Sequence, residues 1–94
     1  MEKAGWVYIL ANRAFGTLYI GVTGDLDRRL SEHHAPDARG FAAKYRATRL
    51  VYAERHDSID AAIRRETSMK RWRRSWKVDL VMSANPEWRD IWSE

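Results

Sequence analysis

Two stretches near the beginning of the chain, residues 6–10 and 17–22, are rich in β-branched and aromatic hydrophobic side chains. Such runs favour β-strands, because these side chains pack well on a pleated surface. A polar stretch that ends in Phe15-Gly16 separates the two runs. The pattern therefore predicts a β-hairpin.

A helix is predicted directly after the hairpin. Asp25 follows a glycine and is a suitable N-cap, because its carboxylate can accept a hydrogen bond from a free backbone N–H of the first turn. Leu26, Leu30 and His33 then recur at helical spacing. We expect this helix to run to about His34.

The second half of the chain alternates between turn-forming, helix-forming and strand-forming patterns. The predicted elements are a loop over residues 35–40, a short helical turn over 41–45, a strand over 49–54, a long helix over 59–72 and a short helix over 76–82. Asp57 or Ser58 is expected to cap the long helix. Pro86 suits the first position of a helix and predicts a last helical turn that carries Trp88 and Trp92.

The order β-β-α-β-α-α describes an α+β fold, with helices packed on a small, mainly antiparallel, three-stranded sheet. A chain of 94 residues is too short for two ordinary domains. We therefore expect one domain over residues 1–94, as a monomer or a weak dimer.

The composition excludes several classes of site. The chain has no cysteine, so any metal would be bound by oxygen or imidazole, which favours magnesium or manganese. No apolar run approaches the ~18 residues of a membrane span, and the first residues lack the regions of a signal peptide. We expect a cytoplasmic protein without a membrane partner.

The charge of the chain points to a polyanion. The net charge is +4, and seven bases fall between Arg64 and Lys77 with Glu66 as the single acid. Such a cluster attracts phosphates, although it is also compatible with a merely solvated helix. The bases expected to contact nucleic acid are Lys70, Arg71, Arg73, Arg74 and Lys77. Trp72 and Trp76 are interpreted as core anchors, with stacking on bases as the alternative.

Glu66 is the most informative single residue. On a helical wheel it lies between Ala62, Ile63 and Met69, inside an apolar stripe. A carboxylate there needs a cation, a metal or hydrogen-bond donors, because burying it alone costs several kcal/mol. Two readings remain open, an internal salt bridge to an arginine such as Arg29 and a metal ligand.

Strand alternation gives the hairpin a pair of phenols. If the turn is centred between Arg13 and Ala14, Tyr8 and Tyr19 are direct cross-strand partners, and Gly21 leaves backbone room beside them. A phenol has an ordinary pKa near ~10, so that activation of water would require a cation or metal nearby. The alternative is that both tyrosines simply pack in the sheet.

Arg29 and His33 lie four positions apart in the predicted first helix and therefore share a face. The helix leaves the sheet just after Tyr19 and Gly21, so both side chains can point at the tyrosines. An arginine fork suits the charge that develops on a transferring phosphoryl group. The same pair also fits an ordinary exposed helix face.

Together these residues resemble the GIY-YIG nuclease motif. Val7-Tyr8 and Tyr19-Ile-Gly21 stand with ten residues between the tyrosines, Arg29 lies ten residues after the second tyrosine, and Glu66 follows Arg65 in a later helix. Trp6 stands where the name motif has its first glycine. Segments similar to the small stand-alone bacterial members are residues 18–23, 25–30, 70–72 and 85–88. The resemblance covers nearly the whole chain.

The resemblance implies a metal-dependent endonuclease that hydrolyses phosphodiester bonds of nucleic acid, DNA in preference to RNA. One divalent metal, Mg²⁺ or Mn²⁺, would be held by Glu66. Water would be activated by Tyr8 or Tyr19, and Arg29 would stabilise the charged transition state. His33 matches a histidine that many members carry after that arginine.

Two other functions are compatible with the sequence. One is a nucleic-acid-binding module that kept the fold without efficient turnover, and the other is a protein-interaction domain whose basic helix docks on an acidic partner. Some relatives carry an asparagine after the glutamate, whereas residues 66–84 contain none and Asn85 lies too far along. The presence of all the other site side chains favours the nuclease, because a pure binder needs no inward-facing glutamate.

Overall fold

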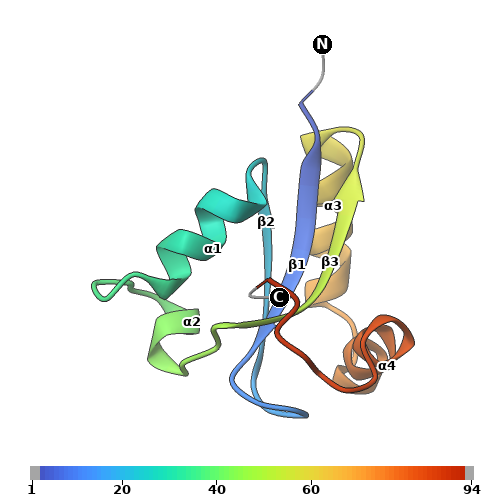
Figure 1. Ribbon diagram of the computed structural model, residues 1–94. Helices are drawn as coiled ribbons and strands as arrows, with labels where there is room; N and C mark the ends of the chain where they lie inside the picture. Colours follow the sequence, from blue (N-terminus) through green and yellow to red (C-terminus); the bar gives the residue numbers. More distant parts are fainter. Residues whose placement is uncertain (1–2, 93–94) are drawn as a thin grey trace.

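A computed structural model describes residues 3–92. It has the expected α+β architecture, with a three-stranded antiparallel sheet in the order β2-β1-β3 and helices on both faces (Figure 1). The elements are β1 (Gly5–Ala11), β2 (Leu18–Thr23), α1 (Leu26–His34), α2 (Phe41–Lys44), β3 (Arg49–His56), α3 (Ile59–Lys70) and α4 (Arg74–Ala84). Within this part of the chain no helix is long and apolar enough to cross a membrane. The domain expected over residues 1–94 extends at both ends beyond the described residues.

The hairpin forms as predicted, but its register differs. Tyr8 pairs with Gly21, and Tyr19 pairs with Leu10, so the expected direct pairing of the two tyrosines is wrong. The cause lies in the turn, because the Asn12 side chain accepts a hydrogen bond from the Thr17 backbone N–H at 2.9 Å. This closes a loop centred one residue later than expected. Pairing therefore moves by two residues, which leaves every side chain on its expected face.

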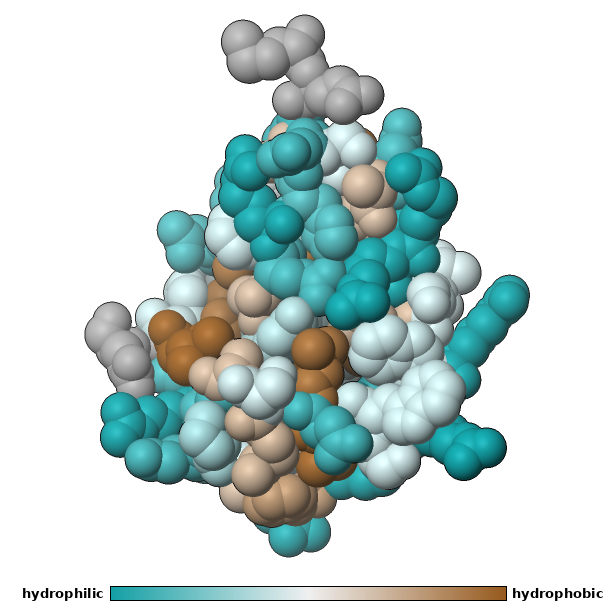
Figure 2. Space-filling model, turned by 90° about the vertical axis from the view of Figure 1, so that its right-hand side faces the viewer, coloured by the Kyte–Doolittle hydropathy of each residue, from teal (hydrophilic) through white to brown (hydrophobic). Residues whose placement is uncertain are grey.

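The sheet separates two apolar clusters, and β1 is almost wholly buried between them. On one face α3 and α4 cover Val7, Ile9 and Val51. On the other face α1 and α2 cover Tyr8 and Leu10. Figure 1 shows α1 and α2 on the opposite side of the sheet from α3 and α4. Figure 2 shows the α4 side of the molecule, where brown apolar side chains reach the surface between teal hydrophilic ones.

Helices α1 and α3 begin where their caps predict, whereas α4 begins at Arg74, two residues before the predicted helix over 76–82. The Asp25 carboxylate accepts from the Arg28 backbone N–H at 3.2 Å, and the Ser58 hydroxyl accepts from the Ala61 N–H at 3.1 Å. Of the two caps considered for the long helix, Ser58 is therefore the one used. That helix ends at Lys70, two residues earlier than expected, because the backbone tightens into a turn in which the Trp72 N–H bonds the Met69 carbonyl.

The last segment is not the helical turn that Pro86 led us to expect. Helix α4 ends at Ala84, and the buried Asn85 side chain donates to the Val51 and Arg89 carbonyls while accepting from the Arg89 N–H. These bonds hold the chain in an irregular loop around Trp88, which is buried and has a φ of 56°. Side-chain bonds to distant backbone thus replace a local helix here.

A polar network joins β3 to α3 on the α4 side of the sheet. The Glu54 carboxylate accepts hydrogen bonds from the Tyr52 hydroxyl at 2.7 Å and from Arg65 Nε at 3.0 Å, and it also pairs with His56. Burial by itself would raise the pKa of Glu54, but the bonds from Tyr52, Arg65 and His56 outweigh it and lower the pKa. Burial and the carboxylate raise the pKa of Tyr52 to about 12. The network therefore stabilises the ionised form of Glu54.

We expect Glu54→Gln to lower the free energy of unfolding at pH 7 by about 2 kcal/mol, because the paired charge is lost. A carboxyl whose folded pKa is depressed contributes stability above its unfolded pKa and loses that contribution as the pH falls through the folded value. The gap between wild type and variant should therefore shrink below pH ~4.3, the ordinary pKa of glutamate. Urea denaturation at pH 7 and pH 3 measures it. A gap that stays constant with pH would contradict this account.

Candidate active site

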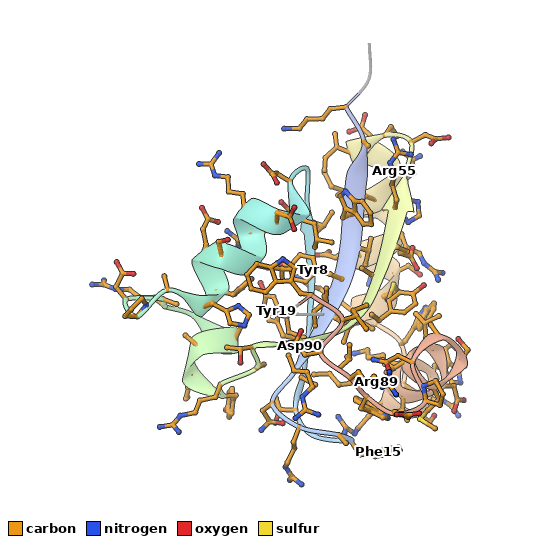
Figure 3. All side chains as sticks on the ribbon, viewed as in Figure 1. Tyr8, Phe15, Tyr19, Arg55, Arg89 and Asp90 are labelled. Carbon is orange, nitrogen blue, oxygen red and sulfur yellow. The ribbon has the colours of Figure 1, made fainter. Side chains whose placement is uncertain are left out.

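The tyrosines of the hairpin lie together on the face of the sheet that α1 covers. They are diagonal neighbours, with ring centroids 6.3 Å apart (Figure 3). The ring of Tyr8 is fully buried and lies directly over Gly21, where any side-chain carbon would overlap its hydroxyl end. The close approach of Tyr8 therefore favours glycine at this position of β2, in agreement with the backbone room expected beside the tyrosines.

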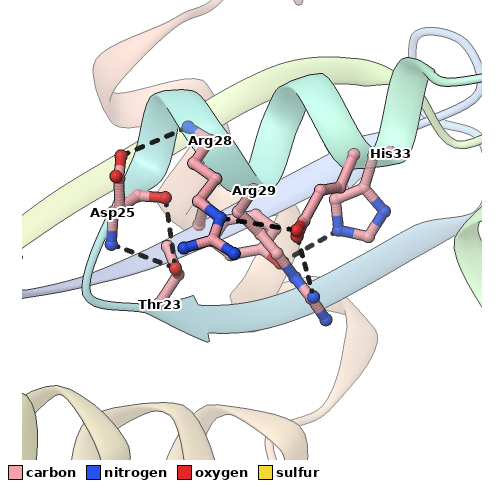
Figure 4. Close-up of polar contacts among 7 residues, drawn as sticks. Thr23, Asp25, Arg28, Arg29 and His33 are labelled. Atoms are coloured by element: carbon pink, nitrogen blue, oxygen red, sulfur yellow. Dashed lines mark hydrogen bonds and ion pairs between the residues drawn. The ribbon is translucent and has the colours of Figure 1, made fainter.

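Helix α1 brings Arg29 and His33 to the same place. Its N-cap, Asp25, fixes where the helix starts, so that residues 29 and 33 fall on the face turned to the sheet (Figure 4). His33 Nε2 lies 3.1 Å from the Tyr8 hydroxyl oxygen. The imidazole ring centroid lies 5.5 Å from that of Tyr19. Tyr8 also interacts electrostatically with Arg29 and Tyr19. The four residues predicted from strand and helix spacing thus form one contiguous cluster.

The electrostatics of this cluster favour a neutral histidine beside a protonated phenol. Burial raises the pKa of Tyr8, and the hydrogen bond from Arg29 opposes that rise only partly. Burial and the nearby positive charges of Arg29 and His34 lower the pKa of His33. The bond to Tyr8 raises the pKa of Arg29, which stays charged. With Nε2 unprotonated, His33 can accept the proton of the Tyr8 hydroxyl.

Arg29 also reaches the surface. Its side chain is 45% exposed and its guanidinium lies 3.3 Å from a carboxylate oxygen of Glu32. Arg29 and Glu32 line both of two adjoining cavities, of about 480 Å³ and about 380 Å³. The sequence analysis missed Glu32, although its spacing of three residues from Arg29 on a helix is a usable signal. An anion can reach the arginine from either cavity.

Glu66 lies on α3, across the sheet from the tyrosines. Its side chain is 13% exposed, and its carboxylate pairs with the Lys70 ammonium at 3.1 Å. The salt bridge considered for it was to Arg29, whereas the ion pairs of the structure join Glu66 to Lys70 and Arg29 to Glu32. This ion pair connects Glu66 with the basic end of the helix rather than with the Tyr8 cluster.

The comparison with known families decides the identity of the fold. The family model described as the GIY-YIG catalytic domain matches residues 4–79. This range includes both tyrosines, Arg29, His33 and Glu66. The chain belongs to the GIY-YIG family.

Several known proteins are similar to this chain over most of their own length. A UPF0213 protein from Natronomonas pharaonis is 38% identical over 81 residues, covering 86% of this chain and 94% of that protein. One from Syntrophus aciditrophicus is 36% identical over 86 residues, covering 87% of this chain and 93% of that protein. The solution NMR structure of the UPF0213 protein BH0048 from Bacillus halodurans matches with a TM-score of 0.58 and 30% identity, over 94% of this chain and 93% of that one.

GIY-YIG nucleases typically use a divalent metal, which raises the question of which residues of this chain could bind one. Among residues 3–92 no group of three or more His, Asp or Glu side chains could hold a metal ion. Glu66 is instead a single, mostly buried carboxylate. That donor set does not fit zinc, but it fits Mg²⁺, which keeps several waters and is bound through one or two carboxylates together with substrate phosphates.

The basic residues of this GIY-YIG domain differ in their exposure and in their bonding partners. Arg71 and Arg73 are exposed, and Lys77 is half-buried. Lys70 is paired with Glu66, and Arg74 donates to the Phe15 and Gly16 carbonyls of the hairpin turn at 2.7 Å each. Arg74 therefore fastens α4 to the hairpin.

The two tryptophans of the basic segment were interpreted as core anchors. Trp72 is half-buried and packs against the apolar cluster under α3 and α4, in agreement with that interpretation. Trp76 is 52% exposed, so the interpretation is wrong for it. A helical spacing of four residues places both indoles on one side of a helix. Here the helix is interrupted between them, and only the first turns inward.

Proposed function

We propose that this GIY-YIG domain is a divalent-metal-dependent endonuclease that hydrolyses phosphodiester bonds of nucleic acid, with DNA as its substrate. The observation that carries the proposal is the cluster of Tyr8, Tyr19, Arg29 and His33, in which two phenols, a neutral imidazole and a guanidinium share hydrogen bonds and ring contacts. A merely packed core has no need of so many titratable groups at one point.

The cluster offers a path for the proton of the attacking water, which ends in the hydrogen bond between Tyr8 and His33. Tyr8 is fully buried and Tyr19 is not, so Tyr19 is the phenol that can meet water at the substrate. As water attacks phosphorus and the bond to the leaving oxygen breaks, its proton passes to the Tyr19 oxygen. The Tyr19 proton moves to Tyr8, and the Tyr8 proton moves to His33 Nε2. Solvent protonates the leaving oxygen and later takes the proton from His33.

Arg29 supplies the positive charge for the transition state. Its guanidinium already donates to Tyr8 and Glu32, and it borders both cavities. A phosphate that enters either cavity can replace the Glu32 carboxylate as its partner, since both are bidentate acceptors. The charge that builds up on the phosphoryl oxygens is then met by a fixed donor.

Glu66 is the residue that would hold Mg²⁺ or Mn²⁺. Because α3 packs on the other face of the sheet from Tyr19 and Arg29, a metal bound there would supply Lewis-acid chemistry only to a phosphate that also reaches α3. Lys70 pairs with this carboxylate, so its ammonium would compete with a metal for Glu66. The Lys70 side chain is 56% exposed, so the loss of that ion pair would cost little.

The pairing of Glu66 with Lys70 also favours a second candidate, a nucleic-acid-binding module without turnover, because a carboxylate held by an ammonium needs no metal. Cleavage assays on labelled single-stranded, duplex and branched DNA and on RNA, with Mg²⁺, Mn²⁺ or chelator, separate the two. Metal-dependent cleavage supports the nuclease. Binding of the same strands without any cleavage supports the module.

We expect the double change Arg71→Ala and Arg73→Ala to weaken nucleic-acid binding about equally for all sequences and to flatten its salt dependence. Each lost phosphate contact should reduce the slope of log affinity against log salt by about one unit. Fluorescence anisotropy across a salt series measures it. Arg74→Ala is the matched control, because Arg74 is bonded to the hairpin carbonyls and its loss should affect stability rather than the slope. An unaltered slope in the double variant would show that these two arginines, in the turn between α3 and α4, are merely solvated.

A further inference from the structure

Trp76 is a large aromatic side chain that the core does not use. It is 52% exposed at the first turn of α4, and the Arg73 guanidinium lies over its ring at 5.9 Å from the centroid. The edge-to-face contact with Trp72 has a centroid distance of 6.2 Å. An exposed indole leaves a large hydrophobic area in contact with water. An exposed indole that its neighbours hold in place therefore marks a candidate binding site.

The Trp76 indole is supported by a series of side-chain contacts. The Arg65 guanidinium lies over the Trp72 ring, 4.9 Å from its centroid, and is itself fixed by the Glu54 carboxylate at 3.0 Å from Nε. Trp72 packs against the apolar cluster of the sheet. The Trp76 ring is therefore positioned before any partner arrives, which lowers the entropy cost of binding.

The surroundings of Trp76 decide the kind of partner. Seven bases lie between Arg64 and Lys77, and the only acid there, Glu66, is paired with Lys70. A second copy of this chain, with a net charge of +4, would meet the same positive face and be repelled. A partner that combines negative charge with flat aromatic surfaces is a nucleic-acid strand. In a duplex the flat faces of the bases are stacked on one another, whereas the faces of an unpaired base are accessible to an aromatic side chain.

We propose that Trp76, supported by Trp72 and flanked by Arg73, is a stacking platform for an unpaired base, and that the preferred substrates of this domain contain a single-stranded segment. The inference rests on the proposed function in so far as it takes nucleic acid as the partner. Figure 2 shows the face concerned, on which pale side chains of intermediate hydropathy adjoin teal hydrophilic ones. The platform follows the proposed metal ligand along the chain, since Lys70, the ion-pair partner of Glu66, ends α3 and Trp76 lies in the first turn of α4.

The test measures binding in EDTA, so that no strand is cut. Fluorescence anisotropy compares three labelled probes of equal length: a single strand, the same backbone with abasic sites, and a blunt duplex. The wild type should bind the single strand about 10-fold more tightly than the abasic strand, since base–aromatic stacking is worth that much or more. Trp76→Ala should lose this preference and leave affinity for the abasic strand unchanged. Trp76→Phe should keep part of it.

Tyr45→Ala is the matched control. Tyr45 is 42% exposed, and the Lys44 ammonium lies over its ring, so it has the same chemistry outside the basic segment. Its replacement should not change binding. Thermal unfolding of both variants shows that each is folded, and Trp76→Phe keeps the test valid even if Trp76→Ala unfolds.

Three results obtained with a protein that does bind the probes would overturn the platform. They are a Trp76→Ala variant that binds the single strand as the wild type does, an equal loss on all three probes, and a wild type that self-associates through this face in sedimentation experiments. In each case metal-dependent cleavage by the wild type would leave the proposed nuclease standing. A wild type that binds none of the probes overturns the platform, and its cleavage assay then decides the nuclease separately.

Discussion

Glu66→Gln is expected to abolish metal-dependent cleavage, with a fall in turnover of about 10³-fold or more, because a bound metal supplies several kcal/mol of transition-state stabilisation. Glutamine keeps the shape of a side chain that is only 13% exposed and can still accept a hydrogen bond from Lys70. The fold should therefore remain. Calorimetric titration with Mn²⁺ should show binding to the wild type and none to the variant.

The matched control for that change is Glu87→Gln. Glu87 also pairs with a nearby base, Arg89 at 2.8 Å, but it lies exposed in the segment after α4. The same loss of one charge should leave both cleavage and Mn²⁺ binding unaltered there. If Glu66→Gln binds Mn²⁺ and cleaves as well as the wild type, the assignment of the metal ligand is wrong.

Most of the fold could be predicted from local sequence patterns. The hairpin, the capped helices and the third strand follow from side-chain alternation and from Asp25 and Ser58, which act within a few residues of themselves. The register of the hairpin did not follow, since it depends on the Asn12 side chain bonding the Thr17 backbone rather than on hydrophobicity. The error was two residues. It kept Tyr8 and Tyr19 on one face, so the predicted grouping of the site survived it.

Contacts between residues far apart in the chain could not be predicted from the sequence. The segment after α4 is irregular because Asn85 bonds Val51 and because the Ile91 N–H bonds the Leu50 carbonyl. The engagement of Arg74 by the hairpin turn and the exposure of Trp76 depend in the same way on how α4 lies against the sheet. Periodicity identifies which residues share a helix face, but it does not say whether that face meets the core.

Tyr8→Phe and Tyr19→Phe are each expected to lower turnover by about 10²-fold or more, because each removes one hydroxyl from the proposed proton path. Folding should change little, since the rings stay and the Tyr8 change loses hydrogen bonds worth about 1 kcal/mol each. Arg29→Ala should lower turnover more than it weakens binding, because the fork is needed mostly when charge builds up at phosphorus. Single-turnover cleavage, with affinity measured in parallel, separates these effects.

The proposed path from Tyr19 through Tyr8 to His33, whose Nε2 lies 3.1 Å from the Tyr8 hydroxyl oxygen, makes a sharper demand than the single changes. If protons pass along it, either loss breaks the same path, so the double Phe variant should be scarcely slower than the worse single one. Tyr52→Phe is the matched control, because it removes a bonded hydroxyl from the opposite face of the sheet and should not alter turnover. Independent packing roles would instead make the two losses add. Should both Phe variants cut at the wild-type rate, the tyrosines only pack against α1, and the proton path proposed for them does not exist.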